Sequence, residues 1–230
     1  MGAEWGENFV GRLAVSRPLE PHLTVPRVVR LSCILGALVL FALLAWEMVE
    51  GETRRFDGAV REFVHFHSPD WLTAAMRGFT WLGSTLVVAI VATCSFAALW
   101  VEGLRRRAVE MAIIVGGGGL LTWVLKVSFQ RERPVPFFDT VILDSYSFPS
   151  GHALISFCFY WACATVLCAG EARRWVRVGI WSLAAVLVLS IGYSRIYLGV
   201  HYPSDVVAGY LAALVWVIGV DVAYGRKNQH

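Results

Sequence analysis

The sequence contains almost nothing outside its hydrophobic runs that could fold as a soluble domain. Of its 230 residues, 57% are hydrophobic, and the mean hydropathy is +0.60. That apolar fraction exceeds the near-even one of soluble domains. A membrane-spanning helix needs roughly 20 apolar residues. Six runs approach this length: about 31–49, 80–101, 108–127, 153–169, 177–194 and 204–224. The connectors are short, so we expect residues 1–230 to form one all-α, polytopic membrane domain with six spanning helices.

Several other features are missing. The five cysteines all lie in hydrophobic runs and none has Cys-x-x-Cys spacing, so neither a disulfide framework nor a zinc site is indicated. Residues 1–30 lack a hydrophobic core of their own, which argues against a cleavable signal peptide and favours a cytoplasmic segment. The run "GGGG" at 116–119 lies inside a span rather than after a strand, so it favours close helix packing over a phosphate-binding loop.

Positive charge is unequal on the two sides that six spans define. Lys and Arg near span ends favour the cytoplasm. Twelve of them fall on the side of the termini: Arg12, Arg17, Arg27, Arg30, Arg105, Arg106, Arg107, Arg173, Arg174, Arg177, Arg226 and Lys227. Eight fall on the other side: Arg54, Arg55, Arg61, Arg77, Lys126, Arg131, Arg133 and Arg195. We therefore expect an inner (plasma) membrane protein with both termini cytoplasmic. Acidic residues dilute only the first four of the eight, so the last four need another explanation.

The first of three polar patches is "KVSFQRERP" at 126–134. If the third span continues as a helix, Lys126 and Arg133 lie two turns apart on nearly the same face, and Pro134 then ends the helix. Two cations so placed form an anion clamp. A pair of unrelated interfacial cations gives the same pattern when this patch is considered alone.

The second patch is "PSGH" at 149–152, just before the fourth span. Ser150 and Gly151 place free backbone N–H groups and the positive end of a helix at one point, which favours anion binding. His152 lies beside them and can give or accept a proton. The alternative is that Ser150 is only a helix N-cap and His152 an interfacial residue.

The third patch is "SRIYLGVHYPSD" at 194–205. Pro203 suits the first turn of the last helix. Asp205 then lies near His201 and can hold one ring nitrogen, leaving the other free, as in the imidazole–carboxylate half of a catalytic triad. A capping aspartate beside an unrelated histidine is the simpler alternative.

All three patches face one side of the membrane, because the third-to-fourth and fifth-to-sixth connectors share a side in any six-span arrangement. Ionisable groups at membrane depth are typical of functional sites. No second carboxylate accompanies Asp205 to hold magnesium, and no His–Cys cluster is present to hold zinc, so we expect no metal and no other cofactor. Cations without a metal indicate a phosphate ligand, and two histidines can share the roles of nucleophile and acid.

Taken together, the motifs resemble those of the type 2 phosphatidic acid phosphatase family. They are K-x6-RP (Lys126, Arg133, Pro134), PSGH (Pro149 to His152) and SR-x5-H-x3-D (Ser194, Arg195, His201, Asp205). The family also includes lipid phosphate phosphatases and, on a soluble all-helical scaffold, vanadium haloperoxidases. Within the family, the chain resembles the small bacterial members that dephosphorylate undecaprenyl diphosphate or phosphatidylglycerol phosphate.

This resemblance implies a role for each matching residue. His201 is the nucleophile that forms a phospho-histidine, Asp205 orients it, and His152 protonates the leaving group. The phosphoryl oxygens are bound by Lys126, Arg133, Ser150, Gly151 and Arg195. Arg131, Glu132 and Ser194 flank the motifs and receive no role.

The expected activity is metal-independent hydrolysis of a lipid phosphate or diphosphate at the outer membrane surface. The expected partners are the bilayer and the phosphorylated lipid, and nucleic acid is not among them; the sequence sets neither the lipid nor the oligomeric state. A phosphotransferase of the same family fits the motifs equally. A channel or flippase for phosphorylated lipids is disfavoured, because spans two to five carry no charge at mid-depth, and membrane embedding disfavours a haloperoxidase. Segment 56–67 predicts a short amphipathic helix on the outer surface, with Phe56, Val60, Phe63 and Val64 on one face.

Overall fold

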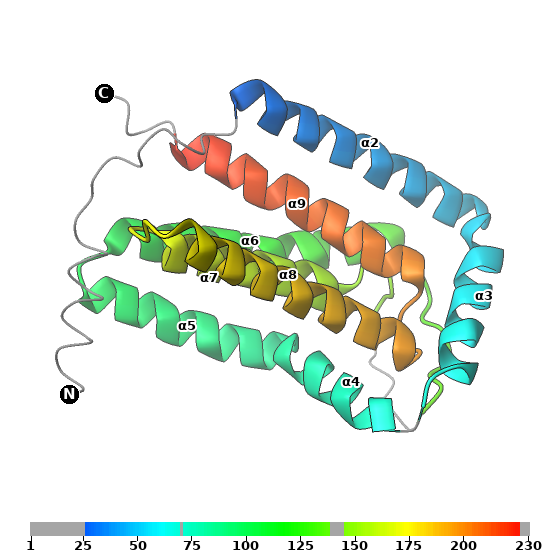
Figure 1. Cartoon of the computed structure of the whole chain (residues 1–230). Helices are drawn as coiled ribbons and strands as arrows, with labels where there is room; N and C mark the ends of the chain where they lie inside the picture. The colour runs from blue at the N-terminus through cyan, green and yellow to red at the C-terminus, as the bar shows by residue number, and fades with distance from the viewer. Residues whose placement is uncertain (1–25, 70, 139–144, 226–230) are drawn as a thin grey trace.

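The computed structural model describes residues 26–69, 71–138 and 145–225, and all regular secondary structure within these ranges is helical (Figure 1). The helices are α2 (Arg27–Glu50), α3 (Thr53–Phe66), α4 (Trp71–Leu82), α5 (Thr85–Val101), α6 (Arg105–Phe129), α7 (Gly151–Cys168), α8 (Arg174–Tyr197) and α9 (Pro203–Gly225). The prediction of an all-α membrane fold is confirmed. The predicted N-terminal segment falls almost wholly outside the described residues, as do Arg226 and Lys227.

Five of these helices are long and apolar enough to cross a membrane: α2, α6, α7, α8 and α9. The pair α4 and α5 meets the same condition only together and is bent by 46°, which gives up to six spans. The predicted run 80–101 therefore began too late and missed a bend. A Cβ on Gly83, at this bend, would lie 2.3 Å from Cγ2 of Ile191, so the missing side chain lets α8 approach. Ser84 then caps α5 by accepting a hydrogen bond from the Val87 N–H (3.3 Å).

Helix α7 occupies the centre of the bundle, where it packs against α5, α6, α8 and α9. Small buried residues along it, such as Ala153, Ser156 and Ala162, allow this close packing. The predicted role of the "GGGG" run is confirmed at two positions. A Cβ on Gly117 would lie 2.1 Å from the Trp216 ring, and one on Gly118 would lie 2.8 Å from Sγ of Cys158.

The amphipathic helix predicted at 56–67 is α3, but its faces differ from the prediction. Phe56 and Phe63 are more than 60% exposed, whereas Val64 is buried against Leu198 and its neighbours. The expected apolar face is thus divided between two sides. The inner side is set by Thr53 and Asp57, both buried, whose polar groups hydrogen-bond within the protein rather than to solvent.

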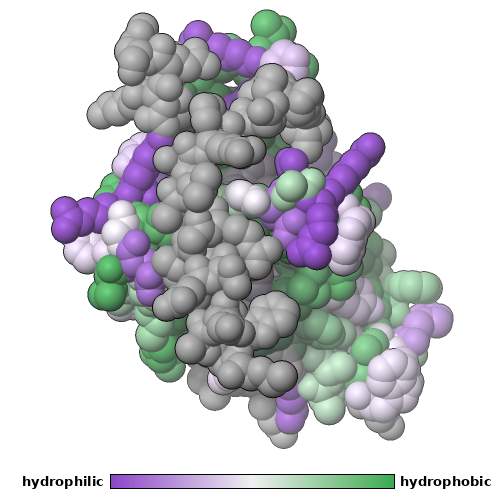
Figure 2. All heavy atoms as spheres, turned by 60° about the vertical axis from the view of Figure 1, so that its left-hand side comes forward, coloured by the Kyte–Doolittle hydropathy of each residue, from purple (hydrophilic) through white to green (hydrophobic). Residues whose placement is uncertain are grey.

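The connectors α6–α7 and α8–α9 meet at the end of the bundle that α3 covers (Figure 1). The opposite end carries the start of α2, the α5–α6 and α7–α8 connectors and the end of α9. There Arg30 pairs with Asp221 (2.8 Å), and Arg106 donates to the Tyr224 carbonyl (3.2 Å). Figure 2 shows hydrophilic side chains gathered at this opposite end beside hydrophobic ones. The described members of the two predicted cation sets therefore lie at opposite ends of the bundle.

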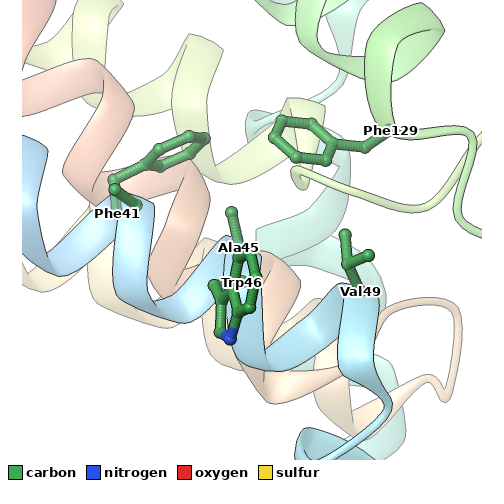
Figure 3. Close-up of a pocket in the computed structure, with 6 residues that line it drawn as sticks. Phe41, Ala45, Trp46, Val49 and Phe129 are labelled. Carbon is green, nitrogen blue, oxygen red and sulfur yellow. The ribbon is translucent and has the colours of Figure 1, made fainter.

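An apolar pocket of about 360 Å³ lies between α2 and the end of α6 (Figure 3). Phe41, Ala42, Ala45, Trp46, Val49 and Phe129 line it. Phe129 also packs against Phe148 (ring centroids 5.0 Å apart), and Phe148 directly precedes Pro149 and Ser150. Aromatic packing thus joins this hydrophobic pocket to the PSGH segment.

Candidate active site

The first patch does not continue as a helix, so the prediction that Lys126 and Arg133 share a helix face is wrong. Helix α6 ends at Phe129, and Gln130 adopts a left-handed conformation with φ 48°. Directly after this turn, Arg131 faces two carboxylates. The extended segment after Gln130 brings Arg133 to the α8–α9 connector, where it donates to the Val200 carbonyl (3.1 Å). Lys126 stays on α6 and donates to the Tyr146 carbonyl.

His201 and Asp205 lie as their spacing predicts, at the start of α9. The helix begins at Pro203, and Asp205 accepts a hydrogen bond from the Tyr202 N–H (3.0 Å) in its first turn. The same oxygen, Oδ2, lies 3.3 Å from Nδ1 of His201 and accepts from Oγ of Ser147 (2.5 Å). Ser147 is a partner that the sequence did not reveal, because 54 positions separate it from His201.

The spacing of His201 and Asp205 predicted that the second ring nitrogen of His201 is free. In the structure this nitrogen has a partner. Nη1 of Arg133 lies 3.1 Å from Nε2. An arginine can only donate, so Nε2 carries a lone pair and Nδ1 carries the hydrogen that faces Asp205. Burial lowers the pKa of His201 to about 3, well below its ordinary value of 6.5. The ring is therefore neutral at ordinary pH, and its Nε2 lone pair points toward the cations.

Ser150 occupies the N-cap position of α7, but its hydroxyl makes no capping bond. Its Oγ is buried and has no hydrogen-bond partner among the described residues. The Ser150 N–H donates to the Asp205 carbonyl (2.9 Å), which fixes the start of α7 against α9. A Cβ on Gly151 would lie 3.2 Å from Thr122 and 3.7 Å from Cε of Lys126. The glycine thus allows the Lys126 side chain to lie against the first turn of α7, where helix N–H groups favour an anion.

Arg195 is buried at the end of α8 and donates to the hydroxyl of Thr80 in α4. Its Nε is also buried and has no partner in the described part of the chain. His152 lies in the first turn of α7, directly after Ser150 and Gly151. The structure thus brings together all eight residues predicted from the motifs: His201, His152, Asp205, Lys126, Arg133, Ser150, Gly151 and Arg195.

The motifs assign no role to Arg131, Glu132 and Ser194, and in the structure these three residues have different surroundings. Arg131 forms ion pairs with Asp205 (2.6 Å) and Asp57 (2.8 Å). Burial alone would lower the pKa of Arg131, but these two carboxylates raise that pKa above its ordinary value. Glu132 is exposed, and Ser194 donates to the Ile191 carbonyl within α8 (2.6 Å). Only Arg131 belongs to the site.

A family model described as the PAP2 superfamily matches residues 107–228. The chain belongs to this superfamily. Phosphatidylglycerophosphatase B of Bacillus subtilis is 30% identical over 204 residues, which cover 83% of this chain and 96% of the relative. An undecaprenyl-diphosphatase of Sulfolobus acidocaldarius is 36% identical over 140 residues, 59% of each chain.

The fold of this PAP2 protein is similar to a solved structure as well. The crystal structure of a transmembrane PAP2 type phosphatidylglycerolphosphate phosphatase from Bacillus subtilis matches with a TM-score of 0.77 at 26% identity. It covers 86% of this chain and 98% of the solved chain. The family resemblance and the prediction of a phosphatase are thereby confirmed.

Proposed function

We propose that this PAP2 protein hydrolyses a lipid phosphate or diphosphate through a phospho-histidine intermediate on His201. The observation that carries the proposal is the setting of the His201 ring. Nδ1 faces Asp205 at 3.3 Å, while Nε2 has a lone pair and lies at the cationic group, 3.1 Å from Arg133. A neutral, oriented imidazole beside phosphate-binding cations is the arrangement that nucleophilic attack on phosphorus needs.

In the first step, Nε2 of His201 attacks phosphorus and the bond from phosphorus to the lipid oxygen breaks. His152, which takes up a proton when the anionic substrate is bound among the cations, gives that proton to the leaving oxygen. Asp205 accepts the Nδ1–H and stabilises the positive charge that the ring acquires. Lys126, Arg133, Arg195, the Ser150 hydroxyl and the Gly151 N–H bind the phosphoryl oxygens, whose charge is spread in the transition state.

In the second step, water attacks the phosphorus of phospho-His201. Now neutral, His152 takes a proton from the water as the N–P bond breaks, and inorganic phosphate leaves. Both histidines return to their starting protonation states. Each step uses only residues of this chain and water, so we propose that no metal or other cofactor takes part.

The substrate is proposed to be a phosphorylated membrane lipid. The site lies at the ends of helices that are long enough to span a bilayer, which is the depth of a lipid headgroup. Relatives named for phosphatidylglycerophosphate and undecaprenyl diphosphate make these two lipids the leading candidates. Phosphatidate and lipid A phosphates share the same chemical group and belong in the same assay.

Phosphate release tests this proposal directly. The purified protein in detergent is expected to release inorganic phosphate from at least one of these four lipids, with EDTA present throughout. The His201→Ala protein, purified in the same way, serves as the blank. Activity that disappears in EDTA and returns with added magnesium would contradict the metal-independent mechanism.

We further propose that the site faces the periplasm or cell exterior. The end of the bundle opposite the site carries the arginines in the first turn of α6 and around the start of α8, and such charge favours the cytoplasm. Val135 lies in the α6–α7 connector and is 81% exposed, while Arg174 is exposed at the start of α8. Cysteines placed at these two positions, in a chain without its native cysteines, therefore report on opposite ends.

In intact cells, an impermeant thiol reagent is expected to label Val135→Cys and to leave Arg174→Cys unlabelled. Permeabilised cells are the control, since both positions should then react. Labelling of Arg174→Cys alone in intact cells would reverse the orientation and make the substrate a lipid of the cytoplasmic leaflet.

A further inference from the structure

Asp57 of α3 is a buried carboxylate that none of the motifs contains. Its side chain is 0% exposed. Oδ2 accepts hydrogen bonds from Nη2 of Arg131 (2.8 Å) and Oγ of Ser204 (2.6 Å), and Oδ1 accepts from the Ser204 N–H (3.0 Å). A buried charge with this many partners is fully hydrogen-bonded.

Asp57 and Asp205 share one partner, Arg131. Nη1 of Arg131 donates to Oδ1 of Asp205 (2.6 Å) and to Oγ of Ser204 (2.7 Å), while Nη2 donates to Asp57. The guanidinium lies between the two carboxylates, and its centre is 4.0 Å from the Tyr202 ring. Arg131 therefore holds Oδ1 of Asp205, and Oδ2 is the oxygen that faces His201, Ser147 and the Tyr202 N–H.

Asp57 also fixes the first turn of α9 from outside that helix. Ser204 follows Pro203 in this turn, so its N–H is one of those without an intrahelical partner. A carboxylate at this point both satisfies the N–H and complements the positive helix end. The turn that Asp57 holds is the one that carries Asp205.

A second contact of α3 fixes the connector that carries His201. Nη2 of Arg61, one helical turn after Asp57, donates to the carbonyls of Val135 (2.8 Å) and Gly199 (3.1 Å). These carbonyls belong to the segments that bear Arg133 and His201. The inner side of α3 thus faces the back of the site at two points.

We propose that Asp57 is a positioning residue for hydrolysis, acting through Arg131 and Ser204 on Asp205; this inference rests on the proposed function of His201. The negative charge of Asp57 balances Arg131, so that Arg131 orients Asp205 without drawing its carboxylate away from the ring. Without that charge, Arg131 pairs with Asp205 alone and competes with the Nδ1–H of His201. The attack on phosphorus then becomes slower, while phosphate binding is unaffected because Asp57 contacts none of the proposed phosphate ligands.

The test is Asp57→Asn, which keeps the shape and removes the charge. With an aryl phosphate substrate, kcat is expected to fall roughly 10–100-fold, by analogy with the loss caused by removing partners that orient metal-bound imidazoles. KM should stay unchanged, as for an interaction made in the transition state. Glu62→Gln is the matched control, because Glu62 is exposed on the same helix and loses the same charge.

A double-mutant cycle separates positioning from general destabilisation. In an Asp205→Asn background, Asp57→Asn is expected to cause no further loss of kcat, because its route to His201 is already broken. Additive losses, or a wild-type kcat for Asp57→Asn, would overturn the inference. If Asp57→Asn does not fold, Ser204→Ala replaces it, and an unchanged kcat in that variant overturns the inference equally.

The proposed function itself is checked in the same assay by His201→Ala. If that variant keeps its activity, the phospho-histidine mechanism fails whatever Asp57 does. If it is inactive while Asp57→Asn equals wild type, only the positioning role fails.

Discussion

His201→Ala is expected to abolish turnover of every phosphate ester, whether the leaving group is a lipid alkoxide or an activated phenol. The substitution removes the atom that forms the bond to phosphorus, so no better leaving group can restore the reaction. Turnover should fall to the blank level, and no acid-labile phospho-enzyme should form from a radiolabelled substrate. Quenched single-turnover reactions followed by gel electrophoresis measure that species directly.

The matched variant is His201→Asn, which retains a polar side chain of similar reach but has no nucleophilic ring nitrogen. It should behave like alanine. A phospho-enzyme that still forms in both variants would assign the nucleophile to another residue, with His152 the first to examine.

His152→Ala should fail differently, because it leaves the nucleophile and the phosphate ligands in place. The loss should be ~10²–10⁴-fold with a lipid substrate, the usual contribution of general acid catalysis. The phenolate of an activated aryl phosphate leaves without needing a proton, so this substrate should recover part of the loss. The measurement is the ratio of kcat values for aryl and alkyl phosphates in wild type and in each histidine variant.

Lys126→Ala is the control for this comparison. Lys126 belongs to the proposed phosphate ligands, so its loss should weaken the binding of both substrates alike. The ratio of kcat values for aryl and alkyl phosphates should therefore stay near the wild-type value. Recovery by the better leaving group in the His201 variant rather than the His152 variant would reverse the two roles.

The parts of the site that the sequence predicted are those set by local spacing and by topology. The interval of four residues between His201 and Asp205 spans the start of one helix, and the structure places Nδ1 and Oδ2 3.3 Å apart. Two spans separate the third-to-fourth connector from the fifth-to-sixth one, so both connectors lie on the same side of the membrane. This places the PSGH segment on the side of His201 and Asp205. Neither inference needs a side-chain contact between distant segments.

The remaining parts depend on contacts that no local pattern reveals. Asp57 and Arg131 are 74 positions apart, and a carboxylate on an amphipathic helix is usually a solvent-facing one. Helical periodicity wrongly predicted that the segment with Arg131 is helical, because it cannot register the two ion pairs that Arg131 forms with distant carboxylates. The bend at Gly83 was missed for a similar reason, since only the approach of Ile191 explains it.

The contacts between α3 and α9 also determine when the site exists during synthesis. Asp57 belongs to the second described helix, whereas Arg131, Ser204 and Asp205 are synthesised 74 or more positions later. A ribosome-bound chain that has inserted α2 through α8 therefore has an incomplete active site. In such a chain, Asp57 does not yet have Ser204 as a hydrogen-bond partner, and Arg131 does not yet have Asp205. On the proposed mechanism, hydrolysis is expected to begin only once α9 has entered the bilayer and packed against α2 and α7.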